Sequence, residues 1–343
     1  MDYFTERDTE NLKRLEKLRA ELPPFCSEFF LGISQRTSTL TRLNYGYDLR
    51  VFFKYLTSSV EEFIDRKTWE FKVDDLNKVT THDIELYAAW LDMRDAGEGA
   101  IVTNKPTTKM RKLATLRSFF AYFFKKGKLE KNVLPNVDLP KLHDRAIVRL
   151  DNPEVKRVLQ TVEAQDGLTK GQMRFTKNTL RDQTIIVFFL TTGIRVSELV
   201  GLDIGDIDLK NASFKVTRKG GNQEILFMPE DLQAQLAQYF ENMKTDDVKQ
   251  PLFKSLQNKR ICVRAVQNLV KKYASIAVPL KKISPHKLRS TFGTNLYRAT
   301  GDIYVVANVL GHRDVNTTKK HYAAMTEDIR RDAAKSVRLN PDE

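Results

Sequence analysis

The chain has 343 residues, of which 41% are hydrophobic and 29% charged, and its formal net charge at pH 7 is +13. The length is enough for two domains, the composition excludes an intrinsically disordered chain, and no apolar run approaches the roughly 20 residues that span a bilayer. The charged N-terminus lacks a signal-peptide core, and Cys26 and Cys262 match no metal-ligand spacing, so we expect a reduced cytoplasmic protein.

The positive charge is concentrated just before the middle of the chain, where residues 101–150 hold 12 Lys/Arg and three Asp/Glu. A basic surface of this kind favours a polyanion, most often nucleic acid, as the partner. A solvated basic face explains the same charge equally well, so charge alone leaves both interpretations open.

Residues 1–135 show the spacing of amphipathic helices. A charged helix is expected over residues 1–22, and a short amphipathic pattern covers residues 82–93. Between them, four apolar residues recur at the i, i+3, i+4, i+7 spacing of a core-facing helix. These residues are Leu49, Phe52, Phe53 and Leu56.

The clearest helix begins near Pro106 and ends near Gly127. One apolar stripe runs along it, formed by Leu113, Leu116, Phe120, Phe123 and Phe124. Polar residues on the remaining surface could contact DNA phosphates while the stripe packs inward. These candidate DNA-binding residues are Thr107, Thr108, Lys109, Arg111 and Lys112. A surface helix with solubilising lysines is the alternative.

A proline-bearing stretch follows, and it predicts a linker over residues 143–150 between an N-terminal domain, 1–142, and a second domain, 151–343. In the second domain, an apolar helix is expected over residues 182–193, where it closes on Gly193, and a short helix follows it. Alternating residues on either side of residues 218–222 then predict a β-hairpin with a glycine-bearing turn, and the pattern from about residue 230 is helical again.

Six polar residues of the second domain stand in unusual sequence settings: Arg195, Lys219, His286, Arg289, His312 and Tyr322. Each alone is more often a structural or merely exposed residue. Together they supply what metal-free cleavage of a phosphodiester requires, namely cations for the non-bridging oxygens, an acid for the leaving oxygen and a nucleophile. Tyrosine, with a pKa of about 10, attacks effectively only beside a base or in a strongly positive site.

These residues lie in stretches that resemble the motif series of the tyrosine recombinase and integrase family, and most closely its Xer-type members, which resolve chromosome dimers. The stretches are TTGIRVSEL with GLDIGDID, VTRKGG, SPHKLRSTFGTNL and GDIYVVANVLGHRDVNTTKKHY. In the first half, TTKMRKLATLRSFFAYFFKKGKLEKNV resembles the end of that family's core-binding domain. The resemblance is weakest over residues 1–35 and 60–100. It implies a mainly α fold with a small antiparallel β-sheet, in which a helical SAM-like core-binding domain and a mixed α/β catalytic domain form a C-shaped clamp on DNA.

The resemblance also implies a role for each residue. Arg195 and Arg289 would bind the non-bridging oxygens of the scissile phosphate, and His312 would donate a further hydrogen bond to it. Lys219 would protonate the leaving 5′ hydroxyl, His286 would act as acid and base, and Tyr322 would attack to leave a 3′-phosphotyrosyl bond. Because that bond conserves the energy of the phosphodiester, no ATP, metal or other cofactor is expected. Glu198 would support the catalytic residues, or it could act as a charge at a helix N-terminus.

The sequence departs from the family pattern at three places. Arg218 precedes Lys219 where the family commonly has glycine, so Arg218 competes for the role of acid and is a further candidate DNA contact. Ser290 follows Arg289 where the family often has a second histidine. The spacing from His312 to Tyr322 is one residue longer than in many Xer sequences, and His321 there is expected to face solvent or the phosphate.

The family resemblance predicts double-stranded DNA as the partner and a homotetramer on two DNA sites. The C-terminal tail carries apolar residues four apart, and it could dock on a neighbouring protomer or fold back on its own domain; these residues are Ile329, Ala333 and Val337. The preferred function is chromosome-dimer resolution at a dif-like site by a single nucleoid-associated recombinase, with a DNA translocase or accessory protein as a further partner. The alternatives are an integrase or transposase of a mobile element and a non-catalytic DNA-binding regulator.

Overall fold

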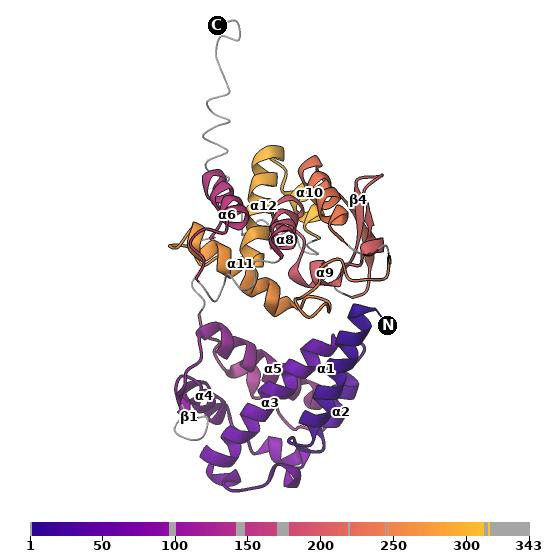
Figure 1. Ribbon diagram of the computed structural model, residues 1–343. Coiled ribbons are helices and arrows are strands. Elements are labelled where there is room, and N and C mark those ends of the chain that lie inside the picture. Colours follow the sequence, from indigo (N-terminus) through magenta and orange to yellow (C-terminus); the bar gives the residue numbers. More distant parts are fainter. Residues whose placement is uncertain are drawn as a thin grey trace, which may run out of the picture. The chain divides into compact units, whose positions relative to one another are not determined.

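The computed structural model describes residues 2–95, 101–141, 148–169, 178–218, 220–243, 245, 247–311 and 315. Contacts divide the chain into two compact units, residues 1–144 and 145–343 (Figure 1). Of the predicted linker, only residues 148–150 are described. Within the described ranges, no helix is both long enough and apolar enough to cross a membrane.

The regular structure in the described part of the first unit is helical, apart from one antiparallel pair of two-residue strands. Its elements are α1 Tyr3–Arg19, α2 Cys26–Gly32, α3 Thr39–Ser59, α4 Thr81–Trp90, β1 Arg94–Asp95, β2 Ile101–Val102 and α5 Pro106–Lys125, with short 3₁₀ turns at Glu61–Phe63, Thr68–Glu70, Val73–Asn77 and Leu134–Asn136. Side chains cap three of the helix starts: Asp2 accepts N–H bonds at α1, Ser38 does so at α3 and Thr80 at α4. Pro106 at the start of α5 fixes the backbone angle that a helix needs.

The core of the first unit is rich in phenylalanine and takes residues from each of the helices α1 to α5. The predicted stripe of α3 is fully buried, as expected. On α5, however, Phe124 is 47% exposed, whereas Phe119, which the predicted stripe omits, is completely buried. The buried face is centred closer to Leu116 and Phe123 than the prediction assumed, and this places Phe119 inside it and Phe124 at its edge.

The second unit packs its helices around α8, which contacts α6, α10 and α12 (Figure 1). Its described elements are α6 Asn152–Ala164, α8 Thr179–Thr192, α9 Val196–Gly201, a 3₁₀ turn Ile204–Asp206, β3 Ile207–Asp208, β4 Ser213–Thr217, β5 Gln223–Phe227, α10 Glu230–Glu241, α11 Val263–Ala277, α12 Pro285–Thr300 and α13 Ile303–Val309.

The sheet is antiparallel in the order β3-β4-β5, and β4 and β5 form the predicted hairpin. In this register Val216 of β4 lies opposite Glu224 of β5. Phe214 and Val216 point into the core, whereas Ile225 and Phe227 of β5 are exposed. The predicted fold class, mainly α with a small antiparallel sheet, is confirmed.

Candidate active site

Arg195 is placed by a sharp change of direction between α8 and α9. α8 ends at Gly193, whose φ of 61° lies in the left-handed region. A Cβ atom at Gly193 would lie 2.4 Å from Cδ1 of Phe292, so both the backbone conformation and the packing require glycine. Arg195 follows as the N-cap of α9, and its N–H donates to the carboxylate of Glu198 at 3.0 Å, which begins the short helix.

The carboxylate of Glu198 is buried and holds two guanidinium groups. Its Oε1 accepts from Nη1 of Arg195 at 2.8 Å, and its Oε2 accepts from Nη1 of Arg218 at 3.1 Å. An unpaired carboxylate would be costly at this depth, so the two ion pairs fix all three side chains relative to one another. Arg195 begins α9 and Arg218 follows β4, so the carboxylate ties the helix to the hairpin.

Three arginines converge on three consecutive carbonyl groups at the end of α13. The carbonyls at a helix C-terminus have no intrahelical partner and carry partial negative charge, so cations are favoured there. The arginines belong to α9, the hairpin and α12, and they gather around residues 309–311, directly before His312. The pairs are Arg218 Nη2 with the Val309 oxygen at 3.3 Å, Arg289 Nη2 with the Leu310 oxygen, and Arg195 Nη2 with the Gly311 oxygen at 2.8 Å.

Arg289 and His286 lie one turn apart at the start of α12. Arg289 is buried, and its Nη1 also donates to the carbonyl of Gly193, so it joins the end of α8 to the end of α13. His286 is exposed, and its own carbonyl accepts from the hydroxyl of Ser290 at 3.0 Å. This end of α12 therefore offers a buried cation to the arginine cluster and an exposed imidazole beside it.

The structure thus brings together Arg195, Glu198, Arg218 and Arg289, which are up to 94 positions apart in the sequence numbering. Lys219, His312 and Tyr322 lie outside the described residues, as do His321 and the C-terminal tail. Arg218 differs from its expected place at the DNA surface, because its side chain is only 9% exposed and donates to protein groups. One of these groups, Glu224, was missed by sequence reasoning, although its place across the hairpin turn from Arg218 was a usable signal.

In the first unit, the candidate DNA-binding residues of α5 differ in exposure. Thr107 and Arg111 are exposed, and Thr108 is half-buried. Lys109 is half-buried as well, and its Nζ lies 2.8 Å from both carboxylate oxygens of Asp92. The polar start of α5 therefore presents hydroxyl and guanidinium groups to solvent.

Lys112 does not face solvent, contrary to its expected contact with DNA. Its side chain is 8% exposed, and its Nζ donates to the buried Asp48 of α3 at 3.1 Å. Burial lowers the pKa of Lys112, and the nearby Asp48 opposes this shift. Position 112 precedes Leu116 by four residues and Phe119 by seven, so the helix places it on the buried face.

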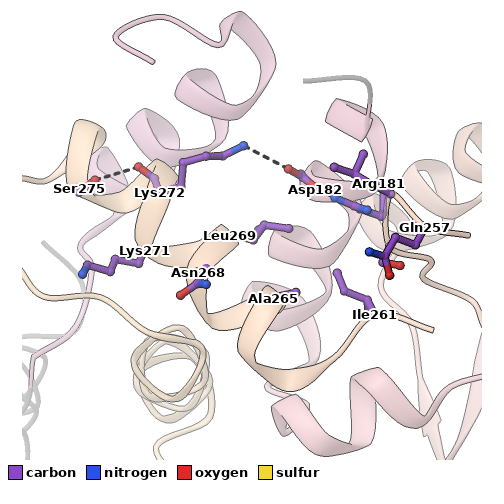
Figure 2. Close-up of a pocket in the computed structure, with 12 residues that line it drawn as sticks. Arg181, Asp182, Gln257, Ile261, Ala265, Asn268, Leu269, Lys271, Lys272 and Ser275 are labelled. Atoms are coloured by element: carbon purple, nitrogen blue, oxygen red, sulfur yellow. Dashed lines mark hydrogen bonds and ion pairs between the residues drawn. The ribbon is translucent and has the colours of Figure 1, made fainter. Parts of the chain in front are cut away.

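The second unit also contains a cavity that is lined in part by α11 and lies apart from the arginine cluster. It has a volume of about 610 Å³, and its lining includes none of the predicted site residues. Figure 2 shows Lys272 reaching towards Asp182, whose buried carboxylate is also paired with Arg181 at 2.6 Å and accepts from Tyr273 at 3.0 Å. The carboxylate of Asp182 in the wall of this cavity is thus paired within the protein, and the arginine cluster is the better candidate for chemistry.

Comparison with protein families identifies both units. A model described as the phage integrase family matches residues 149–328, and one described as the phage integrase N-terminal SAM-like domain matches residues 27–127. Among solved structures, the fold is similar to the Tn1549 transposon integrase in complex with circular intermediate DNA, with a TM-score of 0.62, 21% identity, and coverage of 91% of this chain and 99% of that one. It is also similar to the XerH site-specific recombinase bound to palindromic difH substrate, with a TM-score of 0.61, 18% identity, and coverage of 87% and 80%.

Similar proteins from bacteria support the same family. Tyrosine recombinase XerC of Caldanaerobacter subterraneus is 33% identical over 310 residues, which cover 87% of this chain and 82% of the relative. Tyrosine recombinase XerD of Pseudomonas aeruginosa is 29% identical over 280 residues, which cover 76% of this chain and 90% of the relative. The chain therefore belongs to the phage integrase family and is a Xer-like tyrosine recombinase, an enzyme of site-specific recombination.

Proposed function

We propose that this recombinase cleaves and rejoins double-stranded DNA through a 3′-phosphotyrosyl bond to Tyr322, with the arginine cluster as the phosphate-binding centre. The observation that carries the proposal is the convergence of Arg195 and Arg289 on the segment that precedes His312. Guanidinium groups bind two phosphate oxygens at once and stay charged, which is what a pentacoordinate phosphorane-like transition state requires.

In the proposed reaction, the Tyr322 oxygen attacks the phosphorus while the bond from phosphorus to the 5′ oxygen breaks. Lys219 delivers a proton to that leaving oxygen, and His286 accepts the proton of the tyrosine. Arg195, Arg289 and His312 stabilise the charge on the non-bridging oxygens. Attack by the 5′ hydroxyl of a second strand reverses these steps, releases Tyr322 and completes the exchange.

The two units would divide the work. Residues 1–142 are proposed as the core-binding domain, residues 143–150 as a linker and residues 151–343 as the catalytic domain, together forming a clamp on the duplex. The exposed Thr107 and Arg111 of α5 support a role of that helix in phosphate contact. A homotetramer on two DNA sites, with exchange of the C-terminal segment, is the proposed assembly.

The proposed cellular role is resolution of chromosome dimers at a dif-like site. This role is supported by the relatives named XerC and XerD and by the XerH structure bound to difH substrate. Integration of a mobile element is the alternative. A DNA-cleavage assay separates the two roles when it compares a dif-like duplex with a duplex that carries the ends of a mobile element.

The test uses a nicked suicide substrate, from which the short strand beyond the cleavage site diffuses away and traps the covalent complex. Wild-type protein is expected to form a protein–DNA adduct that survives denaturation, and Tyr322→Phe is expected to form none while its affinity for DNA stays within about threefold of wild type, because phenylalanine lacks only the attacking oxygen. Adducts of undiminished yield with the phenylalanine variant would overturn the assignment of the nucleophile.

A further inference from the structure

Arg218 occupies a position between three segments of the catalytic unit. It follows β4, and its buried guanidinium reaches α9, β5 and the end of α13. Its contacts are Nη1 to Glu198 at 3.1 Å, Nε to Glu224 at 2.7 Å and Nη2 to the Val309 carbonyl at 3.3 Å. One side chain thus bridges the helix that begins with Arg195 and the segment that leads into His312.

The backbone of Arg218 is fixed as firmly as its side chain. Its N–H donates to the carbonyl of Asn222 at 2.7 Å, and its carbonyl accepts from the N–H of Gly221 at 3.1 Å, so both backbone groups of Arg218 are bonded to the start of the returning strand segment. On the far side, a Cβ atom at Gly311 would lie 2.9 Å from Cζ of Arg218. Only glycine at position 311 lets the guanidinium lie this close to the α13 terminus.

The charge of Arg218 is balanced inside the protein. Burial acts to lower the pKa of Arg218, but the bonds to Glu224 and Glu198 outweigh it, and the pKa is raised above its ordinary value. A guanidinium that is held this way keeps its proton and is offset by two carboxylates. It is therefore suited neither to donate a proton to a leaving group nor to bind a phosphate.

We propose that Arg218 is a positioning residue for DNA cleavage, acting by holding Glu198, and through it Arg195, in register with residues 309–311. The inference rests on the proposed function, since it takes Arg195 to bind the scissile phosphate. Arg195 is half-exposed at the cluster, and it keeps one nitrogen on Glu198 and another on the Gly311 carbonyl. Without Arg218, Glu198 loses its second cation. The contacts of Arg195 with Glu198 and with the Gly311 carbonyl then lose their fixed geometry.

The test is the single-turnover cleavage rate of Arg218→Met on the suicide substrate. The rate is expected to fall by about 10- to 100-fold, since a misplacement of about 1 Å is enough for such an effect, with DNA affinity within about threefold of wild type. The same fall is expected on a substrate with sulfur in place of the 5′ bridging oxygen, because a thiolate leaves without an acid. The double variant Glu198→Gln with Arg218→Met should be no more than about threefold slower than the slower single variant. The reason is that both substitutions break the same contact, the ion pair between Arg218 and Glu198.

Arg260→Met is the matched control. Arg260 lies in the same unit and bonds the carbonyls of Val200 and Leu202 at the other end of α9, at 2.9 and 3.0 Å. Its loss should lower the melting temperature, because the two carbonyl contacts and the ion pair with Asp203 are removed, and change the cleavage rate by less than about threefold. An equal loss of cleavage in this control would assign the Arg218 effect to general destabilisation and overturn the proposal.

Two further results would overturn the positioning role while leaving the proposed function intact: a wild-type rate in Arg218→Met, or full rescue by the sulfur substrate, which would make Arg218 part of the leaving-group step. Failure of wild-type protein to form any adduct would instead remove the proposed function itself. If the methionine variant does not fold, Arg218→Lys replaces it. Lysine keeps the charge but not the planar fork, so about a tenfold loss is expected, and a wild-type rate would contradict the proposal.

Discussion

Asp48 in the first unit and Glu198 in the second are both buried carboxylates that hold two cationic side chains, but the cations come from different places. Asp48 of α3 is bound by Arg111, Lys112 and Thr115, all on α5. Glu198 is bound by arginines from two separate segments, and each of these arginines continues to a carbonyl at the end of α13. The first cluster joins two helices of a core, whereas the second assembles a site from parts that are distant in the sequence.

This difference shows what a buried carboxylate can contribute in a basic protein. When its partners lie on one helix, it stabilises the packing of that helix, and its loss should appear mainly in the free energy of unfolding. When its partners bridge several segments, it sets their mutual geometry, and its loss should appear mainly in the reaction rate. The two clusters can therefore be separated by measuring stability and cleavage on the same variants.

The largest expected effect on stability is that of Asp48→Ala. The variant leaves the ammonium of Lys112 buried without its carboxylate, which should cost about 3–5 kcal/mol in the free energy of unfolding. Urea denaturation of the whole protein, followed by a signal from the first unit, measures this. The pair of Asp92 and Lys109 supplies the control: its carboxylate is 60% exposed, so Asp92→Ala should cost less than about 1 kcal/mol. Equal losses in the two variants would contradict the comparison.

The next effect is kinetic. Arg195→Ala removes a preorganised cation from the proposed phosphate site, and single-turnover cleavage should slow by about 10²- to 10³-fold, or roughly 2.7–4 kcal/mol of transition-state stabilisation. Its DNA affinity should change far less, since other phosphate contacts remain. A variant that binds DNA weakly but cleaves at the wild-type rate once saturated would place Arg195 in binding and not in catalysis.

The smallest effect separates two neighbours on α5. Arg111 is 49% exposed and Lys112 is 8% exposed, although both contact Asp48. Arg111→Ala should reduce the slope of log affinity against log salt concentration by about 0.9, the value for one phosphate contact. Lys112→Met should leave that slope unchanged and lower the melting temperature instead. The comparison fails if Lys112→Met changes the slope as much as Arg111→Ala does.

Much of the fold could be predicted because it depends on local patterns. Pro106 and the apolar spacing of α5 predict that helix, and the glycine-bearing turn after Arg218 predicts the hairpin. The prediction was wrong for Phe124 and Lys112, because the position of a residue around the helix axis determines whether its side chain is buried or exposed. A stripe drawn through the most apolar residues does not fix the centre of the buried face, because that centre depends on the helices packed against it.

The candidate site was predictable in its residue types but not in its contacts. The resemblance to the family indicated Arg195 and Arg289, and the spacing of Arg195 and Glu198 on one short helix allows their ion pair. The contact of Arg218 with Glu198 joins residues 20 positions apart, and that with the Val309 carbonyl joins residues 91 apart. Neither follows from local spacing, because both exist only when the hairpin and α13 pack against α9.

The most direct test of the proposed chemistry is to locate the covalent bond. Digestion of the trapped adduct with trypsin should release residues 321–330, HYAAMTEDIR, in which Tyr322 is the sole tyrosine. Mass spectrometry is expected to find the nucleotide attached to this peptide through a 3′ phosphate. A nucleotide attached to any other peptide, or through a 5′ phosphate, would contradict the assignment of Tyr322 as the nucleophile.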